Sequence, residues 1–367
     1  MTATPRARAA TEVRARAATG VRTGAATGVR ARAAITATAL ALAVTVAGCG
    51  ATGPASPSGP ASPAGPATPQ APSGPGCPKP ATVIVHTATE LTTALVAATP
   101  GAVIQLADGG YPGGFTAKRS GTAQAPITLC GGRAAVIDGG RATYSLYLNG
   151  ASYWQVIGFT VRGGDKGVMV DNANDNLFDS LEITNVQAEG IHLRRNSSDN
   201  VIRGNLIHDT GQLQPEFGEG VYVGSARGNW CRYTDCQPDR ADRNLIEHNT
   251  ISRTTAESVD IKEGTTGGVV RENNFTGPTP NAESWVNVKG NGWRIVGNTG
   301  HGSDQDGFSV HQILDGWGID NTFDANTAVV DGPGYGINIT KNKDRNRVTC
   351  SNKAEGAGKG LSNTNCA

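Results

Sequence analysis

VIRGNLI (201–207), LIEHNTI (245–251) and VVRENNF (269–275) are copies of one pattern, which RIVGNTG (294–300) and TFDANTA (322–328) continue. Each copy carries an Asn at the same place, namely Asn205, Asn249, Asn273, Asn298 and Asn326, with spacings of 44, 24, 25 and 28 residues. A period of about 25 residues is that of one coil of a parallel β-helix, and the longest gap fits one coil plus an insertion of about twenty residues. Asn suits a repeated corner, because it tolerates left-handed backbone and its stacked amides bond to one another.

A second set of short strands alternates between apolar and other residues. The segments are GVMV (167–170), GIHL (190–193), GVYV (220–223), SVDI (258–261), WVNV (285–288), GFSV (307–310) and GINI (336–339). Because successive side chains of a strand point to opposite faces, one apolar pair per segment faces inward. Those pairs are Val168/Val170, Ile191/Leu193, Val221/Val223, Val259/Ile261, Val286/Val288, Phe308/Val310 and Ile337/Ile339. The sequence therefore predicts an all-β chain folded as a right-handed single-stranded parallel β-helix.

The composition agrees with a thin core that is repeated many times. The 367 residues include 50 Gly but only 7 Phe and 5 Trp, which argues against a large aromatic core. We expect residues 77–367 to form the β-helix domain, with an insertion at about 209–243. The segment TELTTALVAA (89–98) predicts a short capping helix over the open N-terminal end, where a sheet edge would otherwise be exposed.

The first 76 residues predict export. Residues 1–48 carry seven Arg followed by the apolar run 35–47, which is too short to span a bilayer and is typical of a secretory signal. The run ends in VAGC (46–49), which resembles a bacterial lipoprotein signal with a lipid anchor on Cys49; an ordinary cleavage site is the alternative. Residues 49–76 are rich in Pro, Gly, Ala and Ser and predict a tether. We therefore expect an extracellular or cell-surface protein that touches the membrane only through Cys49.

Six cysteines remain after Cys49, an even number that favours three disulfides in an exported protein. Proximity in the sequence suggests Cys231–Cys236 and Cys350–Cys366, which leaves Cys77 for Cys130, although six cysteines allow fifteen arrangements.

The charge of the chain argues against nucleic-acid binding. The net charge of +1 includes +6 from residues 1–48, so the remainder carries −5. A mildly acidic body does not attract phosphate backbones. We expect a monomer whose anionic partner, if any, is held by a local site.

Equivalent positions on stacked coils form columns of side chains, and three columns carry chemistry. After the inward pairs stand Asp171, Arg194, Gly224, Lys262, Lys289, His311 and Thr340. At the central outward position stand Met169, His192, Tyr222, Asp260, Asn287, Ser309 and Asn338. Before the strands stand Glu189, Glu219, Glu257, Ser284 and Asp306. Stacked like charges need compensation, either from a ligand such as an acidic sugar with Ca²⁺, or from salt bridges of Lys262 and Lys289 with Asp260 and Glu257.

The stretches ESVDIKEGTTGGVVRENNFTG (257–277) and WVNVKGNGWRIVGN (285–298) resemble polysaccharide lyase family 6, the alginate lyase and chondroitinase B group. TELTTALVAATPGAVIQLADGGY (89–111) resembles the family's opening, and the general resemblance covers about residues 80–350. The resemblance implies a parallel β-helix in which Glu257 binds Ca²⁺ and Lys262 is the base. Lys289 stands where the family has Arg, and Thr255 stands where it has a second acidic calcium ligand, for which Glu219 is the substitute.

That resemblance implies β-elimination on an acidic, uronate-containing polysaccharide. Lys262 would remove the proton on C5, after Lys289 and Ca²⁺ lower its pKa, and Lys289 would neutralise the uronate or help protonate the leaving oxygen. Arg194 and His311 would hold neighbouring sugars or act as the acid. His192, Tyr222 and Asn287 complete the expected substrate-binding residues, and Glu257 and Glu219 the metal ligands.

Three other functions stay open at this point. A β-helix glycoside hydrolase would need two carboxylic acids, for which Asp260 with Glu257 or Asp304 with Asp306 are available. A uronate epimerase would share proton abstraction with a lyase. A non-catalytic polysaccharide-binding surface protein would use the same signal and tether. An absorbance assay for unsaturated uronate separates the lyase from all three.

Overall fold

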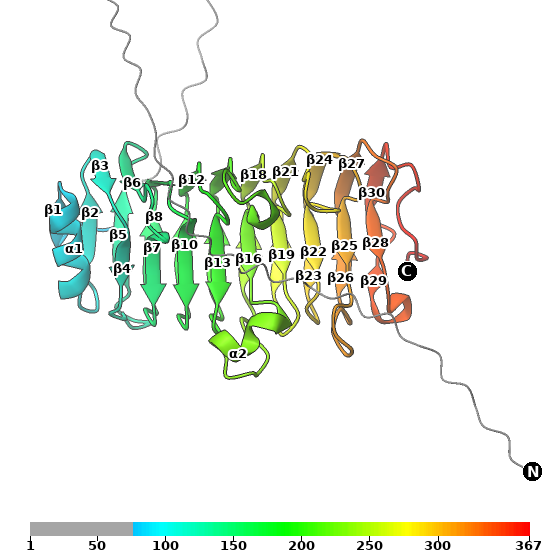
Figure 1. Ribbon diagram of the computed structural model, residues 1–367, viewed down its shortest axis with the longest axis horizontal. Coiled ribbons are helices and arrows are strands. Elements are labelled where there is room, and N and C mark those ends of the chain that lie inside the picture. Colours follow the sequence, from blue (N-terminus) through cyan, green and yellow to red (C-terminus); the bar gives the residue numbers. More distant parts are fainter. Residues whose placement is uncertain (1–75) are drawn as a thin grey trace, which may run out of the picture. The chain divides into compact units, whose positions relative to one another are not determined.

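The computed structural model describes residues 76–367, and these form one right-handed parallel β-solenoid of three long sheets (Figure 1). The predicted fold class is confirmed. The expected signal, Cys49 and nearly all of the expected tether lie outside the described residues.

Each coil adds one strand to each sheet in turn. Sheet A contains β1 (Val83–Val85), β2 (Val103–Leu106), β5 (Ile127–Gly131), β8 (Trp154–Ile157), β11 (Leu177–Asp179), β14 (Val201–Arg203), β17 (Leu245–Glu247), β20 (Val269–Arg271), β23 (Arg294–Val296), β26 (Thr322–Asp324) and β29 (Arg347–Val348). Sheet B contains β3 (Gly109–Pro112), β6 (Ala135–Asp138), β9 (Thr160–Arg162), β12 (Glu182–Thr184), β15 (Leu206–His208), β18 (Thr250–Ser252), β21 (Asn274–Thr276), β24 (Thr299–Ser303), β27 (Thr327–Val330) and β30 (Lys353–Glu355). Sheet C contains β4 (Phe115–Ala117), β7 (Tyr144–Asn149), β10 (Lys166–Asp171), β13 (Ile191–Arg194), β16 (Val221–Val223), β19 (Val259–Ile261), β22 (Val286–Val288), β25 (Phe308–Val310) and β28 (Ile337–Ile339).

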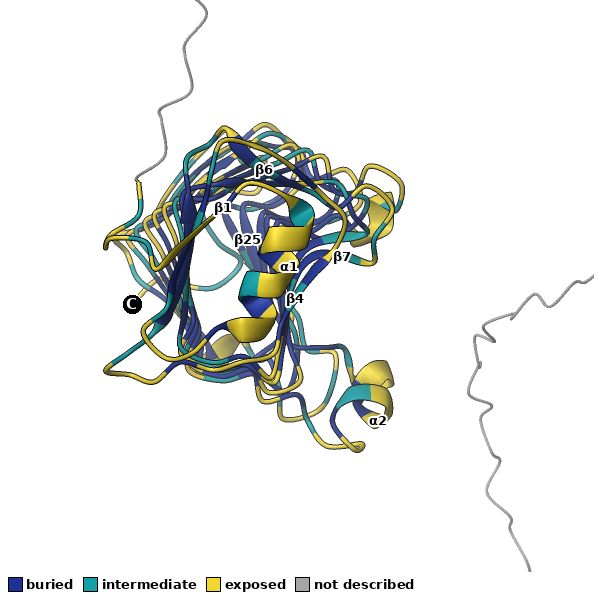
Figure 2. Cartoon of the chain, turned by 90° about the vertical axis from the view of Figure 1, so that its left-hand side faces the viewer, coloured by how far each residue is buried: buried dark blue, intermediate teal, exposed yellow. Residues whose placement is uncertain are grey.

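The core fills the inside of the coils, which Figure 2 shows as a ring of buried residues around the axis. All seven predicted inward pairs are buried in one continuous hydrophobic cluster. Aliphatic side chains make up most of the cluster, and its three Trp and six Phe are spread along the coils, because each coil buries only its own small share of the core.

The repeated Asn forms a ladder at the corner between sheets A and B. Asn249 Oδ1 accepts hydrogen bonds from the backbone N and the Nδ2 of Asn205 at 3.0 and 2.9 Å. Asn249 in turn donates to Asn273 Oδ1 through the same two groups, both at 2.9 Å. The ladder continues through Asn298 and Asn326 to Asn352. Side-chain amides of successive coils therefore satisfy the buried hydrogen-bonding groups of this corner.

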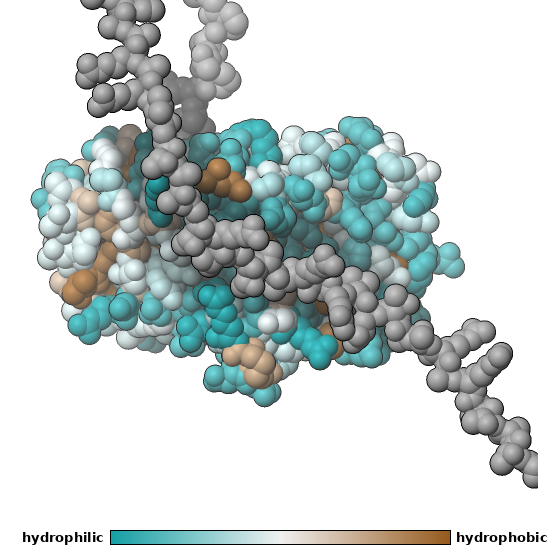
Figure 3. All heavy atoms as spheres, viewed as in Figure 1, coloured by the Kyte–Doolittle hydropathy of each residue, from teal (hydrophilic) through white to brown (hydrophobic). Residues whose placement is uncertain are grey.

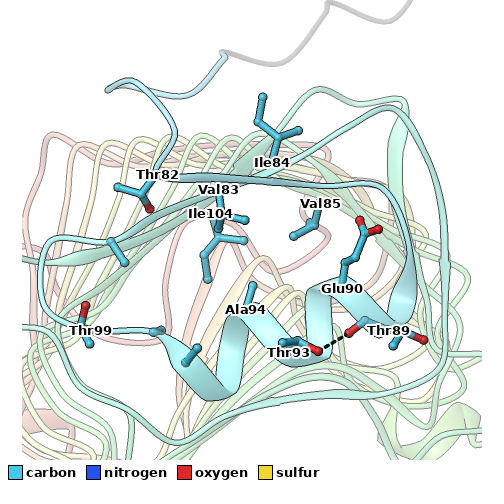
Figure 4. A pocket seen from close by; sticks show the side chains of 13 residues that line it. Thr82, Val83, Ile84, Val85, Thr89, Glu90, Thr93, Ala94, Thr99 and Ile104 are labelled. Atoms are coloured by element: carbon cyan, nitrogen blue, oxygen red, sulfur yellow. Dashed lines mark hydrogen bonds between the residues drawn. The ribbon is translucent and has the colours of Figure 1, made fainter.

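The N-terminal end is covered by α1 (Ala88–Ala97), close to the predicted helix. Thr87 caps it by accepting from Glu90 N at 3.2 Å, and Leu91 and Leu95 point into the core. Hydrophobic surface gathers at this end of the molecule (Figure 3), where Val83, Ile84 and Val96 are exposed. A hollow of about 460 Å³ lies between β1 and α1 (Figure 4). Its lining is largely apolar, so it does not suit an acidic sugar.

The three predicted disulfides are all formed: Cys77–Cys130, Cys231–Cys236 and Cys350–Cys366. Within residues 76–367, no helix has the length and apolar character needed to cross a membrane.

Candidate functional site

The predicted columns lie on the outer face of sheet C. In-register pairing aligns Met169, His192, Tyr222, Asp260, Asn287, Ser309 and Asn338 in one row across seven strands. Several of these outward side chains are nevertheless buried, Asp260 to 1% exposure and Tyr222 to 9%. Neighbouring side chains therefore cover the row.

Two loops flank this face because β16 divides the predicted insertion. The loop before β16 contains the 3₁₀ helix η1 (Pro215–Phe217), and the loop after it contains the 3₁₀ helix η2 (Arg227–Asn229) and α2 (Trp230–Tyr233). Figure 2 shows α2 projecting beside the edge of the sheet that contains β4 and β7. A third 3₁₀ helix, η3 (Lys343–Arg345), lies near the C-terminal end, away from these loops.

Asp260 is the centre of the site, because both lysines converge on it. Lys262 Nζ lies 2.5 Å from Asp260 Oδ2, and Lys289 Nζ donates to Asp260 Oδ1 at 2.6 Å. Lys289 Nζ also lies 3.6 Å from Glu257 Oε1, which accepts a hydrogen bond from Asn287 Nδ2 at 3.0 Å. The salt bridges that the sequence left as an alternative are thus formed, but within a nearly buried cluster rather than on a solvated face.

The expected lowering of the Lys262 pKa is wrong. Burial alone would lower it, but the charge of Asp260, with further contributions from Tyr222 and Glu257, raises the pKa of Lys262 well above its ordinary value. The positive charge of Lys289 would lower the pKa of Lys262, but Lys289 is itself paired with Asp260. Its influence on the pKa of Lys262 therefore does not outweigh that of the carboxylate. Lys262 therefore rests as an ammonium.

Glu219 and Glu257 lie beside Asp260 in an arrangement that could hold a cation. Ligand oxygens of the three carboxylates lie within 4.8 Å of one another. Glu219 is buried, and its Oε2 has no hydrogen-bond partner among the described residues. Burial, together with the charges of Asp260 and Glu189, raises the pKa of Glu219 well above its usual range, and burial beside Asp260 also raises that of Glu257. These donors fit Ca²⁺, which prefers carboxylate oxygen, although the lysines already occupy Asp260.

Tyr222 lies between Lys262 and His192. On one side, Lys262 Nζ is 4.8 Å from the centroid of the Tyr222 ring. On the other side, the centroid of the His192 ring, on the preceding coil, is 4.3 Å from that of Tyr222. Burial and the nearby carboxylates raise the pKa of Tyr222 well above its ordinary value, although Lys262 opposes them, so its hydroxyl stays protonated. His192 Nε2 lies 3.0 Å from Gly224 O, and its Nδ1 is 3.3 Å from Glu189 Oε1.

The remaining predicted residues lie on either side of this centre. Arg194 is 6% exposed and forms a bidentate pair with Asp171, with both hydrogen bonds at 2.8 Å. His311 Nδ1 lies 2.9 Å from Asn287 Oδ1, and burial lowers the pKa of His311. His311 is thus next to the cluster, whereas the guanidinium of Arg194 is already satisfied two coils away from Lys262.

Other residues of this face were not singled out from the sequence. Lys166 pairs with Glu189, and Tyr147 donates to Asp171 Oδ2 at 2.9 Å. Tyr147 pairs in register with Met169 and so extends the central outward row, and Lys166 lies two residues before Val168, as Glu189 does before Ile191, so the same columns could have found both. The sequence offered Asp260 and Glu257 together as partners of the two lysines, but it had no signal that both lysines would pair with Asp260.

Comparisons with known proteins agree with this fold. The family described as "Right handed beta helix region" matches residues 144–237, and no curated protein sequence matches the chain. The crystal structure of the alginate lyase from Paenibacillus sp. str. FPU-7 matches with a TM-score of 0.71 at 37% identity, covering 77% of this chain and 98% of that one.

Two more distant structures share the fold. The pectate lyase Pel9A matches with a TM-score of 0.53 at 18% identity, covering 71% of this chain and 67% of that one. A rhamnogalacturonan lyase matches with a TM-score of 0.51 at 14% identity, covering 74% of this chain and 82% of that one. The assignment to family 6 stays a prediction. The extent and identity of the Paenibacillus match show that the chain belongs to the family of right-handed β-helix polysaccharide lyases that includes this alginate lyase.

Proposed function

We propose that the protein is an exported lyase that cleaves a uronate-containing polysaccharide by β-elimination on the outer face of sheet C. The convergence of Lys262, Lys289 and Tyr222 around Asp260 carries this proposal, because it places a proton acceptor, a cation and a proton donor together. The similarity to an alginate lyase supports the same substrate class.

In this proposal the neutral form of Lys262 takes the proton from C5 of the uronate. The C4–O4 bond breaks, a C4–C5 double bond forms, and the leaving oxygen takes a proton from the Tyr222 hydroxyl. Lys262 would then return a proton to the Tyr222 phenolate; its Nζ lies 4.8 Å from the centroid of the Tyr222 ring. Because the base must be neutral while Asp260 keeps it charged, the rate should rise with pH above neutrality.

Lys289 would neutralise the uronate carboxylate as charge develops on it. His311, with Asn287, would contact the neighbouring sugar beside Lys289, and His192 would hold Tyr222 in place through the tilted contact of their rings. We propose that Arg194 positions this part of the outer face of sheet C through Asp171. Ca²⁺ held by Glu257 and Glu219 would add a further positive charge at the uronate.

The role of Lys262 is tested with two substitutions. Lys262→Arg keeps a cation beside Asp260 but cannot act as a base, so it should lose at least ~10²-fold in rate, as Lys262→Ala should. Both should fold normally, since Asp260 keeps Lys289. The rate is measured from absorbance of unsaturated product on polyuronates, with the exposed Lys353→Ala as control. Full activity of Lys262→Arg would show that Lys262 acts only through its charge.

The calcium proposal is tested by binding as well as by rate. Ca²⁺ should raise the melting temperature of the parent protein, because a ligand that binds only the folded state stabilises it. Glu257→Gln should remove most of that rise, and Glu219→Gln part of it. A parent protein whose melting temperature and rate are the same in Ca²⁺ and in chelator would show that these carboxylates are structural.

A non-catalytic polysaccharide-binding protein is the second candidate, and the charged resting state of Lys262 favours it. Absence of unsaturated product from alginate, glycosaminoglycan and pectic substrates, with binding retained, would establish it; epimerised product would indicate an epimerase. We further propose that the protein is monomeric and anchored through Cys49. Fatty-acid labelling that persists in Cys49→Ala would contradict the anchor.

A further inference from the structure

A second hollow opens at the same edge of sheet C as Lys262, nearer the N-terminal end. It has a volume of about 360 Å³ and is lined by Asn172, Arg195, Asn196, Tyr233 and Asp235, among others. Arg195 follows β13 and Lys262 follows β19, with β16 between them. Two coil steps separate them, about 10 Å at the usual strand spacing. A polysaccharide lying across the strands at Lys262 would therefore reach this hollow within a few sugar rings.

Arg195 differs from the arginines around it. Arg194, Arg240 and Arg243 each form an ion pair with an aspartate. Within residues 76–367, Arg195 contributes only its backbone N to a hydrogen bond, and its exposed guanidinium takes part in no ion pair. A free guanidinium that lines a hollow can bind a carboxylate, because its N–H groups can donate two parallel hydrogen bonds to the two carboxylate oxygens.

The backbone beneath Arg195 is held by a buried carboxylate. Asp239 is fully buried and accepts from the backbone N of Arg195 at 3.0 Å and of Asn196 at 2.8 Å. It also accepts from the Ser225 hydroxyl at 2.8 Å. Arg195 and Asn196 both have left-handed backbone, with φ of 56° and 65°, a conformation that this anchoring compensates. The turn is thus fixed before any ligand binds.

The outer wall of the hollow is fixed as well. The Tyr233 ring lies 3.9 Å from Arg194 Cζ, which Asp171 holds in a bidentate pair. The loop carrying Tyr233 is closed by the Cys231–Cys236 disulfide and returns to the coil through Asp239. Arg194 therefore contacts Tyr233 in the wall of the hollow, whereas its neighbour Arg195 lines the hollow itself.

We propose that this hollow is a second carboxylate subsite, in which Arg195 binds a uronate of the same polysaccharide chain that is cleaved at Lys262. The proposal rests on the proposed function and adds that the enzyme recognises two acidic sugars of one chain. Asn172 and Asn196 would meet the hydroxyls of that sugar. Asp235, which lines the hollow without pairing with Arg195, would weaken the affinity for an anion.

Binding of alginate oligosaccharides to the full chain tests the proposal. In the Lys262→Ala background, which prevents turnover, Arg195→Ala should weaken binding of a hexasaccharide about tenfold, a usual scale for one charge-assisted contact. Binding of a disaccharide, which cannot span both sites, should not change. Asp235→Asn should tighten hexasaccharide binding. Arg294→Ala removes an exposed arginine from sheet A and serves as the control.

The outcomes separate this proposal from the proposed function. Equal hexasaccharide affinity in Arg195→Ala and its parent overturns the subsite alone. Loss of affinity for disaccharide and hexasaccharide alike also overturns it, because the effect would then lie at the cleavage site. A parent chain that binds no uronate oligosaccharide overturns both proposals. If Arg195→Ala unfolds, Arg195→Gln replaces it, with the same expected loss.

Discussion

Asp260 shows how one residue sets the chemistry of its neighbours. It is fully buried, and the charges of Lys262 and Lys289 lower its pKa although burial opposes them. In return its charge keeps Lys262 protonated at neutral pH. The three groups therefore form one electrostatic unit. A change in the charge of the Asp260 carboxylate must change the pKa of the Lys262 amine.

Asp260→Asn should shift the pH dependence of the reaction. Removing the charge of Asp260 takes away the largest influence that raises the Lys262 pKa, so burial should lower that pKa and more Lys262 should be neutral at a given pH. The alkaline rise of kcat/KM should then begin at lower pH than in the parent. The measurement is the pH–rate profile between neutral and alkaline pH, at fixed Ca²⁺.

The same substitution should also cost stability, because it leaves two nearly buried lysines without their shared partner, a loss of about 3–5 kcal/mol at such pairs. Profiles must therefore be taken well below the melting temperature of the variant. An unchanged profile from folded Asp260→Asn would mean that Lys262 does not titrate in the rate-limiting step.

The site could be predicted in part at this scale. Alternation with period two was enough to place Lys262, Lys289 and Tyr222 on one outer face, because it depends only on the backbone. Glu257 has the parity of the inward Val259 and Ile261, and only its place before the strand and the family resemblance marked it. Which charges pair depends on the reach of each side chain and on burial by the flanking loops. The sequence therefore could not show that Asp260 would bind both lysines and reverse the expected pKa shift.

Among the elements, the Asn ladder is the clearest link between sequence and fold. Each amide replaces a solvent contact that the buried corner cannot have, and each is bonded to the next coil. Because every coil needs a hydrogen-bonding side chain at this corner, the same residue recurs at the same place in the sequence. The five copies of the pattern could be recognised for that reason.

Asn249→Ala should destabilise the solenoid. The change leaves the backbone N and Nδ2 of Asn205 without their acceptor, and an unpaired buried polar group costs about 1–3 kcal/mol. The free energy of unfolding, measured in denaturant, should fall by that order. Asn274→Ala, an exposed position on sheet B, is the matched control and should stay within about 0.5 kcal/mol of the parent. Equal effects at both positions would contradict the ladder.

A second ladder escaped prediction. Asn176, Asn200 and Asn244 bond in the same way before the strands of sheet A. Two coils on, Trp293 takes the equivalent place before β23, and Asn321 and Asn346 resume the pattern beyond it. The Trp at this place interrupts the series of Asn residues and conceals its period in the sequence. Either an amide or a packed aromatic ring can occupy the corner before the strands of sheet A.

For the whole molecule, stability depends on how the coils end. Each coil contacts mainly its neighbours, so a solenoid can open from either end while its middle stays folded. Disulfides close both ends here: Cys77–Cys130 joins the segment before β1 to β5, and Cys350–Cys366 holds the C-terminal segment. The proposed cleavage site, by contrast, lies on the middle coils.

Removal of the first disulfide should therefore loosen one end and spare the site. In the chain-entropy account, a bridge across 53 residues stabilises by about 4 kcal/mol, against about 2 kcal/mol for the 5-residue Cys231–Cys236 bridge. Cys77→Ala with Cys130→Ala should lower the free energy of unfolding by up to that larger amount. Hydrogen exchange should quicken first in β1, α1 and β2, with little change in β16, β19 and β22, and the rate on substrate should be kept at moderate temperature. Exchange that quickens equally in all coils would mean instead that the solenoid unfolds as one cooperative unit, so that its ends carry no special weight.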